Sequence, residues 1–117
     1  MSKEIREIIL EGFNSWNTGL DAWKNWVDQA YKNDAFSMNG NRQNKTVSEY
    51  KTEIEADSDK NVKRLYFDNI LINNNWSTIN YRFNSVEGTT KDARDRIQFL
   101  RFEETDEGLK IAETWRK

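Results

Sequence analysis

Apolar residues in the first half of the chain recur at helical spacing in three segments. The first stripe predicts an amphipathic helix of roughly four turns, begun near Ser2, and consists of Ile5, Ile8, Ile9, Phe13 and Trp16. A break at 17–19 separates it from a second helical stripe, which consists of Leu20, Trp23, Val27, Ala30 and Tyr31. Thr46 and Glu49 form a capping box that predicts a third helix running to about Asp57. Residues 35–38 are expected to form a short strand before it, and residues 39–44 a polar loop.

The second half of the chain changes to the period of β-strands. Four segments predict an antiparallel meander: residues 65–72, 76–86, 94–103 and 109–115. Hairpin turns are expected at 73–75 and 106–108, where Asn and Gly tolerate the left-handed backbone. On the second strand, alternation predicts that Ile79, Tyr81 and Phe83 face the helices. Asn80, Arg82 and Asn84 are then expected on the outer face. We therefore expect the helices to cover one face of this sheet.

Composition limits the kinds of protein that this chain can be. Its 117 residues suit one domain over 1–117, and the net charge of −2 gives no general attraction for nucleic acid. The chain has no Cys and no His, which excludes disulfides and thiolate sites and removes the commonest general base. No metal site and no cofactor is predicted. With 36% hydrophobic and 32% charged residues, the chain lacks the long apolar run of a membrane span. An N-terminus without the apolar core of a signal peptide predicts a cytoplasmic location.

The element order, and the closing residues above all, carry a family resemblance. The bacterial SnoaL-like proteins share a closing pattern of Arg-Phe, Gly-Lys-Ile and Glu-His-Trp. This chain resembles that pattern at Arg101-Phe102, at Gly108 and in the run 110–115, with Leu109 inserted after the glycine. The whole order resembles the nuclear transport factor 2-like superfamily. The resemblance implies an α+β cone, with three N-terminal helices packed on a curved, mainly antiparallel sheet and a cavity between them. It also implies a homodimer formed through the outer sheet face.

The same resemblance implies several functions, because the superfamily holds isomerases, polyketide cyclases, hydrolases, dehydratases and non-catalytic binding domains. Two acid–base positions of the family are altered in this sequence. Asn39 stands where family enzymes place an aspartate, and Thr114 stands where the family pattern has histidine. An amide cannot serve as a general base, so the inherited isomerase or cyclase chemistry is not implied for these two positions.

Two carboxylates remain as candidate catalytic groups. Asp68 interrupts an apolar run and shares a face with Tyr66, Ile70 and Ile72 by simple alternation, so an inward Asp68 would be a desolvated proton shuttle. The alternative is a solvent-facing Asp68 with Leu65, Phe67 and Leu71 pointing inward. Glu113 shares a face with Ile111 and Trp115 by the same rule, and its alternative role is a cross-strand ion pair with Arg94, Arg96 or Arg101.

Aromatic residues supply the candidate ligand-binding set. The chain has five Trp, four Tyr and six Phe, and the ordinary role of those in the helical stripes is core packing. Rings beyond what packing needs would suit the walls of an apolar cavity. The predicted lining is Trp16, Tyr31, Tyr50, Tyr66, Tyr81, Phe83 and Trp115. The basic cluster of Lys91, Arg94, Arg96 and Arg101 is interleaved with acids, so it is interpreted as a solvated strand face.

Three functions follow from this set. The first is binding of a small apolar or ring-containing molecule. The second is an isomerase, cyclase or hydrolase that uses a pocket carboxylate with a Tyr. The third is a protein-interaction module whose cavity is filled by its own side chains.

Overall fold

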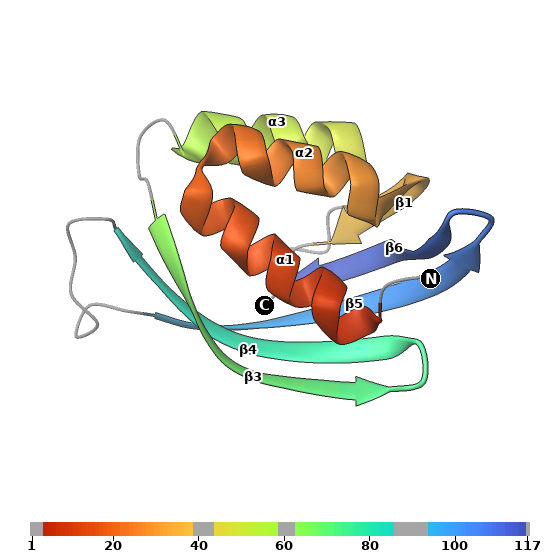
Figure 1. The fold of residues 1–117 in the computed structure, drawn as a ribbon. Coiled ribbons are helices and arrows are strands. Elements are labelled where there is room, and N and C mark those ends of the chain that lie inside the picture. Colours follow the sequence, from red (N-terminus) through yellow and green to blue (C-terminus); the bar gives the residue numbers. More distant parts are fainter. Residues whose placement is uncertain (1–3, 39–43, 59–62, 86–93, 117) are drawn as a thin grey trace.

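The computed structural model describes residues 4–38, 44–58, 63–85 and 94–116 (Figure 1). Within these ranges three helices pack on one face of a six-stranded sheet. The elements in chain order are α1 (Ile5–Thr18), α2 (Leu20–Ala30), β1 (Tyr31–Met38), β2 (Asn44–Thr46), α3 (Val47–Ser58), β3 (Lys63–Asn73), β4 (Trp76–Ser85), β5 (Arg94–Thr105) and β6 (Gly108–Arg116). None of the helices in the described ranges is long and apolar enough to cross a membrane.

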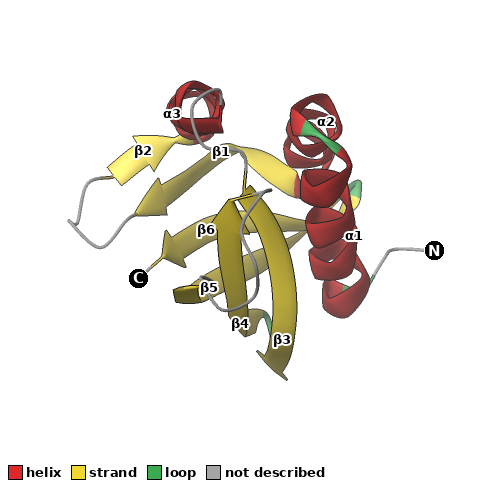
Figure 2. Cartoon of the chain, turned by 90° about the vertical axis from the view of Figure 1, so that its left-hand side faces the viewer, coloured by secondary structure: helices red, strands yellow, loops and turns green. Residues whose placement is uncertain are grey.

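The sheet has the strand order β2-β1-β6-β5-β4-β3, and only the β1–β6 pair is parallel. Figure 1 shows β3, β4 and β5 bending beneath α1, and Figure 2 shows α1 and α2 standing along one side of the sheet with α3 near β1 and β2. The predicted α+β architecture of helices on a curved, mainly antiparallel sheet is therefore confirmed.

The first strand is longer than expected. β1 begins at Tyr31, which has an extended backbone (φ −97°, ψ 146°) directly after α2, instead of at residue 35. Tyr31 pairs with Ile111 of β6, which lies far along the chain. The short strand β2 lies partly where a loop was expected, and it pairs with β1. These pairings extend strand structure into segments whose local pattern is weak, because the partner strand supplies the hydrogen bonds.

The ends of the helices follow local rules. Glu4, not Ser2, is the N-cap of α1, and it forms a capping box with Glu7; Ser2 lies outside the described residues. Gly19 has φ of 156°, which side-chain-bearing residues rarely adopt, and it separates α1 from α2 as predicted. The predicted capping box of α3 is confirmed: the Glu49 amide donates to Thr46 Oγ1 at 3.2 Å and the Thr46 amide to Glu49 Oε1 at 3.3 Å.

Both hairpin turns also form where the sequence places them. Asn74 has φ of 56° in the β3–β4 turn, and Gly108 has φ of 104° where the second hairpin enters β6. Asn and Gly are the residues that adopt such values at least cost. The two turns fix how β3 meets β4 and how β5 meets β6.

The core lies between the helices and the inner sheet face, and it includes the fully buried Val27, Phe102 and Ile111. Gly12 allows α1 and α2 to pack closely: a Cβ there would lie 2.6 Å from the indole ring of Trp26. The Trp26 ring is held in place because its Nε1 donates a hydrogen bond to the Ile8 carbonyl at 3.1 Å. Close helix contact at Gly12 thus sets the position of the aromatic side chains between the two layers.

Candidate ligand-binding site

The aromatic residues of the helices form a connected group of rings. Trp23 packs edge to face against Trp16 at 5.3 Å and against Tyr50 at 5.6 Å between ring centroids. Tyr31 packs against Trp26 at 5.8 Å and, tilted, against Tyr50 at 6.5 Å. These contacts join α1, α2, β1 and α3, so the structure does bring together Trp16, Tyr31 and Tyr50 from the predicted set. Edge-to-face pairs add stability beyond simple burial.

Tyr81 supplies the sheet side of the same interior. It is 6% exposed and packs edge to face against Phe13 of α1, with centroids 5.4 Å apart. Ile79 is likewise buried, and Arg82 is exposed, so the predicted faces of β4 are confirmed at these positions. The side chains of Tyr66 and Phe83 lie outside the described part of the structure.

The inner face of β5 carries polar side chains. Arg96 lies opposite Tyr81 and Gln98 lies opposite Ile79 in the β4–β5 ladder. Residues directly opposite each other in an antiparallel pair share a face of the sheet, and both β4 partners are buried beneath the helices. Arg96 and Gln98 therefore face the helices, and both remain partly exposed. The predicted solvated strand face is therefore not one face shared by the basic cluster, because Arg96 and Arg101 lie on opposite faces of β5.

Further hydrogen-bonding groups lie on this inner face. The Gln98 amide nitrogen donates to the hydroxyl of Thr114, which is buried on β6. Ser77 on β4 is also buried, and its hydroxyl has no hydrogen-bond partner within the described ranges. Thr114, which stands at the family's histidine position, thus lies inside the cone; Asn39 lies outside the described residues. The inner sheet face combines apolar side chains with a few polar groups, as ligand sites do.

The alternation of polar and apolar residues along β5 itself indicates that its polar residues face the helices. Ile97 and Phe99 alternate with Arg96 and Gln98, and they are exposed on the outer face. Leu100 continues the phase of Gln98 and is buried in the core. A strand whose apolar residues face outward and whose polar residues face its own core indicates function on one or both faces.

Asp68 lies on the outer side of the sheet. A β-bulge between Phe67 and Asn69 leaves it without a partner in the β3–β4 ladder. Its carboxylate forms an ion pair with Arg82 Nε at 3.3 Å, and both side chains are exposed. The solvent-facing alternative is the one observed, so Asp68 is not in the interior that a proton-shuttle role requires.

The bulge also corrects the predicted faces of β3. Ile70 is buried opposite Ile79, whereas Leu71 is 60% exposed. An extra residue in one strand reverses which alternate positions face the core, so simple alternation fails after it.

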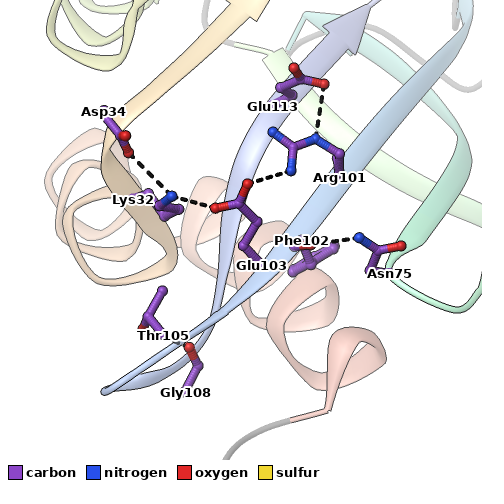
Figure 3. A network of polar contacts seen from close by, with 9 residues as sticks. All are labelled: Lys32, Asp34, Asn75, Arg101, Phe102, Glu103, Thr105, Gly108 and Glu113. Atoms are coloured by element: carbon purple, nitrogen blue, oxygen red, sulfur yellow. Dashed lines mark hydrogen bonds and ion pairs between the residues drawn. The ribbon is translucent and has the colours of Figure 1, made fainter.

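Glu113 also lies on the outer face, in the ion-pair network of Figure 3. Arg101 contacts Glu113 through Nε at 3.2 Å and Glu103 through Nη1 at 2.6 Å. Glu103 in turn pairs with Lys32, which lies 3.6 Å from Asp34. The cross-strand ion pair with Arg101 is thus the observed alternative for Glu113, and its carboxylate lies outside the cone.

A second register shift explains why Glu113 and Trp115 do not share a face with Ile111. Phe102 pairs with Ile111 and Arg101 with Glu113, which leaves Ala112 as the extra residue on β6. Ile111 is fully buried, but Trp115 is 39% exposed. The prediction that Trp115 joins the interior rings is therefore incorrect.

The ion-pair network shifts the pKa values of its members. Hydrogen bonds from Arg101 and then from Lys32 lower the pKa of the Glu103 carboxyl to about 2. The hydrogen bond to Glu103 is also the main cause that raises the pKa of Lys32 and of Arg101. Glu103 is therefore the central anion of this outer-face network.

Replacement of Glu103 by Gln should reduce stability in a pH-dependent way. Because the pKa of Glu103 is lowered on folding, its stabilisation is present above the unfolded-state pKa of about 4.3 and is lost as pH falls toward 2. The difference in unfolding free energy between wild type and Glu103→Gln should therefore be largest near neutral pH. Urea unfolding at several pH values measures this. An equal difference at neutral pH and at pH about 2.5 would contradict it, and about 1 M salt should shrink the difference because these side chains are partly exposed.

Large apolar side chains are exposed on the outer face of the sheet. Leu71, Phe99 and Trp115 lie in one cross-strand row, joined through Thr78 of β4. Trp76 and Ile97 flank this row and are 45% and 40% exposed. We call these five residues the outer apolar patch. The outer face was expected to be polar, and this expectation holds for Arg82 but not for the patch.

A separate cleft opens between α2, β1 and α3. It has a volume of about 310 Å³ and is lined by Val27, Asp28, Tyr31, Lys32, Asn33, Val47, Ser48 and Lys51. Among the described side chains of the predicted lining set, Tyr31 borders this cleft. Its charged residues form ion pairs, Lys51 with Asp28 and Lys32 with Glu103. Neither the Tyr81 ring nor the polar face of β5 belongs to this cleft.

The carboxylates of the described ranges form no group of three or more that could hold a metal ion. Oxygen-only sites for hard cations need several such ligands at once. The absence of a metal and of a cofactor stays a prediction.

Solved structures with the same arrangement of helices and strands are numerous. Wild-type IdmH, a proposed polyketide cyclase from Streptomyces antibioticus, superposes with a TM-score of 0.77 at 9% identity, over 98% of this chain and 91% of that one. A proposed isomerase of the SnoaL-like family from Agrobacterium tumefaciens gives 0.73 at 17% identity, over 94% and 92%. A protein of unknown function from Cytophaga hutchinsonii, described as nuclear transport factor 2-like, gives 0.69 at 14% identity, over 100% and 93%.

The chain has the nuclear transport factor 2-like fold. The resemblance inferred from element order and closing motif is confirmed for the fold, which the chain shares with SnoaL-like proteins. No protein-family model matches the sequence, and no curated protein matches it. At these low identities the solved structures establish the architecture of this chain, while its function must be argued from its own residues.

Proposed function

We propose that this nuclear transport factor 2-like domain binds a small, ring-containing, mostly apolar molecule against the inner face of its sheet. The observation that carries the proposal is the inverted pattern of β5. Arg96 and Gln98 face the helices while Ile97 and Phe99 face outward. Gln98 is hydrogen-bonded to Thr114, and Arg96 also makes contacts of its own, yet both side chains stay partly exposed. A few polar groups on an otherwise apolar inner face are typical of ligand sites, which supports a binding role. Two proteins of the same fold are named for small-molecule reactions, polyketide cyclisation and isomerisation, which supports the same class of ligand.

The aromatic rings would provide the apolar wall of the site. Tyr81 and Phe13 contact each other next to the β5 polar residues, and Trp16 lies one turn further along the same face of α1. Tyr and Trp offer large apolar area together with a directed hydrogen bond. This combination suits a planar ligand.

The outer positions of Asp68 and Glu113 favour binding over catalysis. Each carboxylate is paired with an arginine on the side of the sheet away from the helices. A general acid or base must come within hydrogen-bond reach of the reacting group. A ligand on the inner face would not meet either of the two predicted catalytic groups, so the isomerase, cyclase or hydrolase alternative is the weaker proposal.

We further propose that the outer apolar patch pairs with a second copy of the chain. Exposed rows of large apolar side chains are uncommon on monomers and typical of association surfaces. The patch is bordered by Arg82 paired with Asp68 and by Arg101 paired with Glu103 and Glu113, so the charges of its rim are largely compensated by ion pairs within one chain. Two identical faces with such a rim can meet without repulsion, as a two-fold symmetric dimer requires. The helices would remain on the outside of the dimer, which leaves the inner faces independent.

Titration with phenylnaphthylamine, an uncharged ring compound whose fluorescence rises in apolar surroundings, tests the proposed function. We expect saturable binding with about one molecule per chain and a dissociation constant of micromolar order. Gln98→Phe, which adds a ring on the inner face, should weaken this binding by about tenfold or more. The control Asn14→Phe adds the same ring on the exposed side of α1 and should leave it unchanged. Absence of saturable binding to the wild type, or equal binding by Gln98→Phe, would contradict the proposal.

A further inference from the structure

We infer that the cleft between α2, β1 and α3 is a second binding site, which takes a compact carboxylic acid with an apolar body. The cleft has a volume of about 310 Å³, which lies at the lower end of the range of small-molecule sites. Neither Tyr81 nor the polar inner residues of β5 line it. This second site is therefore separate from the inner face of the sheet and does not depend on the proposed function.

The floor of the cleft is apolar. Val27 of α2 is fully buried, Tyr31 of β1 is 5% exposed, and Val47 of α3 is partly buried. The Tyr31 ring is held in place by its contacts with Trp26 and Tyr50. Side chains that are fixed by their neighbours and still border a cleft provide a preformed apolar surface for the body of a ligand.

The rim of the cleft is rich in hydrogen-bond donors. Asn33 and Ser48 lie exposed on it and can donate through an amide and a hydroxyl group. Lys32 of β1 and Lys51 of α3 add two ammonium groups, each with three N–H donors. Among its described lining residues the cleft thus has two cations and one anion, Asp28. Such a rim favours a ligand whose polar end is an anionic acceptor.

Both lysines are ion-paired within the chain, and a ligand carboxylate would share them with these partners. Lys51 pairs with Asp28, and Lys32 pairs with Glu103 and lies 3.6 Å from Asp34. The side chains of Asp28 and Asp34 are 57% and 80% exposed, so water screens their pairs and makes them weak. Because each ammonium group has three donors, the site does not require an unpaired cation.

Benzoate and benzamide are matched probes of this site, because they share a ring and nearly one shape but only benzoate is charged. Titration of each at constant ionic strength is followed by the backbone amide NMR signals. Benzoate should bind the wild type saturably, with a dissociation constant of about 1 mM or below, and should shift the signals of Asn33 and Ser48. Benzamide should bind about fivefold or more weakly. Saturating benzoate should not displace phenylnaphthylamine.

Lys51→Gln should weaken benzoate binding by about fivefold or more and leave benzamide binding unchanged. Lys24→Gln is the matched control. Lys24 of α2 pairs with Glu55 of α3 at 3.3 Å but does not line the cleft. The control therefore removes the same charge and an ion pair between the same two helices, and it should keep the benzoate affinity of the wild type.

Equal binding of benzoate and benzamide, or benzoate-induced shifts confined to residues away from the cleft, would overturn the inference. Unchanged benzoate affinity in Lys51→Gln, or an equal loss in Lys24→Gln, would overturn the role of Lys51. Displacement of phenylnaphthylamine by benzoate would place benzoate on the inner face and reject the second site. Failure of phenylnaphthylamine itself to bind would instead reject the proposed function and leave this site standing.

Discussion

Phe99→Asp is expected to convert the protein from a dimer to a monomer. Phe99 lies at the middle of the outer apolar patch, between Thr78 and Trp115 in the cross-strand row. A central aromatic anchor typically contributes about 2–4 kcal/mol to an interface, and the substitution also places an unpaired charge there. Dimer affinity should therefore fall by about a hundredfold or more. Because Phe99 is 42% exposed in the single chain, the fold itself should tolerate the change.

Light scattering after size exclusion at about 50 micromolar protein measures this result, a concentration that detects dimers of micromolar affinity. The wild type should have about twice the 13.9 kDa mass of one chain, and Phe99→Asp should have the mass of one chain. Asn14→Asp, which introduces the same charge on the exposed side of α1, should remain dimeric. A monomeric wild type, or a Phe99→Asp variant that remains dimeric, would contradict the proposed interface.

Trp23→Ala should cause a large loss of stability. Trp23 is 5% exposed and joins the rings of Trp16 and Tyr50, so it connects α1, α2 and α3. Truncation of a buried aromatic residue costs about 3–5 kcal/mol, through lost burial and the cavity left behind. Domains of this size unfold with about 5–15 kcal/mol in total, so the variant should be only marginally folded.

Urea unfolding provides the measurement, and Trp23→Phe provides the graded comparison. The Phe variant keeps a ring in place and should lose clearly less stability than the Ala variant. A loss below about 1 kcal/mol for Trp23→Ala, which is typical of surface positions, would show that the ring group does not hold the helices together.

Local signals explain why much of the fold could be predicted from the sequence. The glycine at position 19, the capping box of Thr46 and Glu49, and the left-handed turn at Asn74 each act within a few residues. The helix and hairpin positions follow from such short-range chemistry. The parallel pairing of β1 with β6 depends instead on residues far apart in the chain, and the local pattern of β1 does not contain it.

Two inserted residues explain most errors in the predicted site. The bulge at Asp68 reverses which of the following residues of β3 face the core. The bulge at Ala112 places Trp115 on the face of β6 opposite to Ile111. Trp115 was consequently assigned to the interior, although it lies on the outer face. Bulges depend on how two strands meet, and a strict period of two cannot reveal them.

The prediction for Arg96 fails for a different reason. A charged residue in a strand usually faces water, but the inner face of β5 carries Arg96 and Gln98. Ile97 and Phe99 are the signal that could have shown the inverted strand from sequence alone, because their phase opposes that of Leu100. Inward polar residues are costly in an ordinary core, which is why they indicate a site.

The indole N–H signals of the five tryptophans give the most direct test that the inner face binds ligand and the outer face binds a second chain. Trp16 lies on the helix face beside the inner site, and Trp76 and Trp115 lie in the outer apolar patch. Saturating phenylnaphthylamine should shift the NMR signal of Trp16 and leave Trp76 and Trp115 unchanged, whereas Phe99→Asp should shift Trp76 and Trp115 and leave Trp16 unchanged. Shifts induced by phenylnaphthylamine at Trp76 and Trp115 with none at Trp16 would place the ligand on the outer face and contradict this division of the two surfaces.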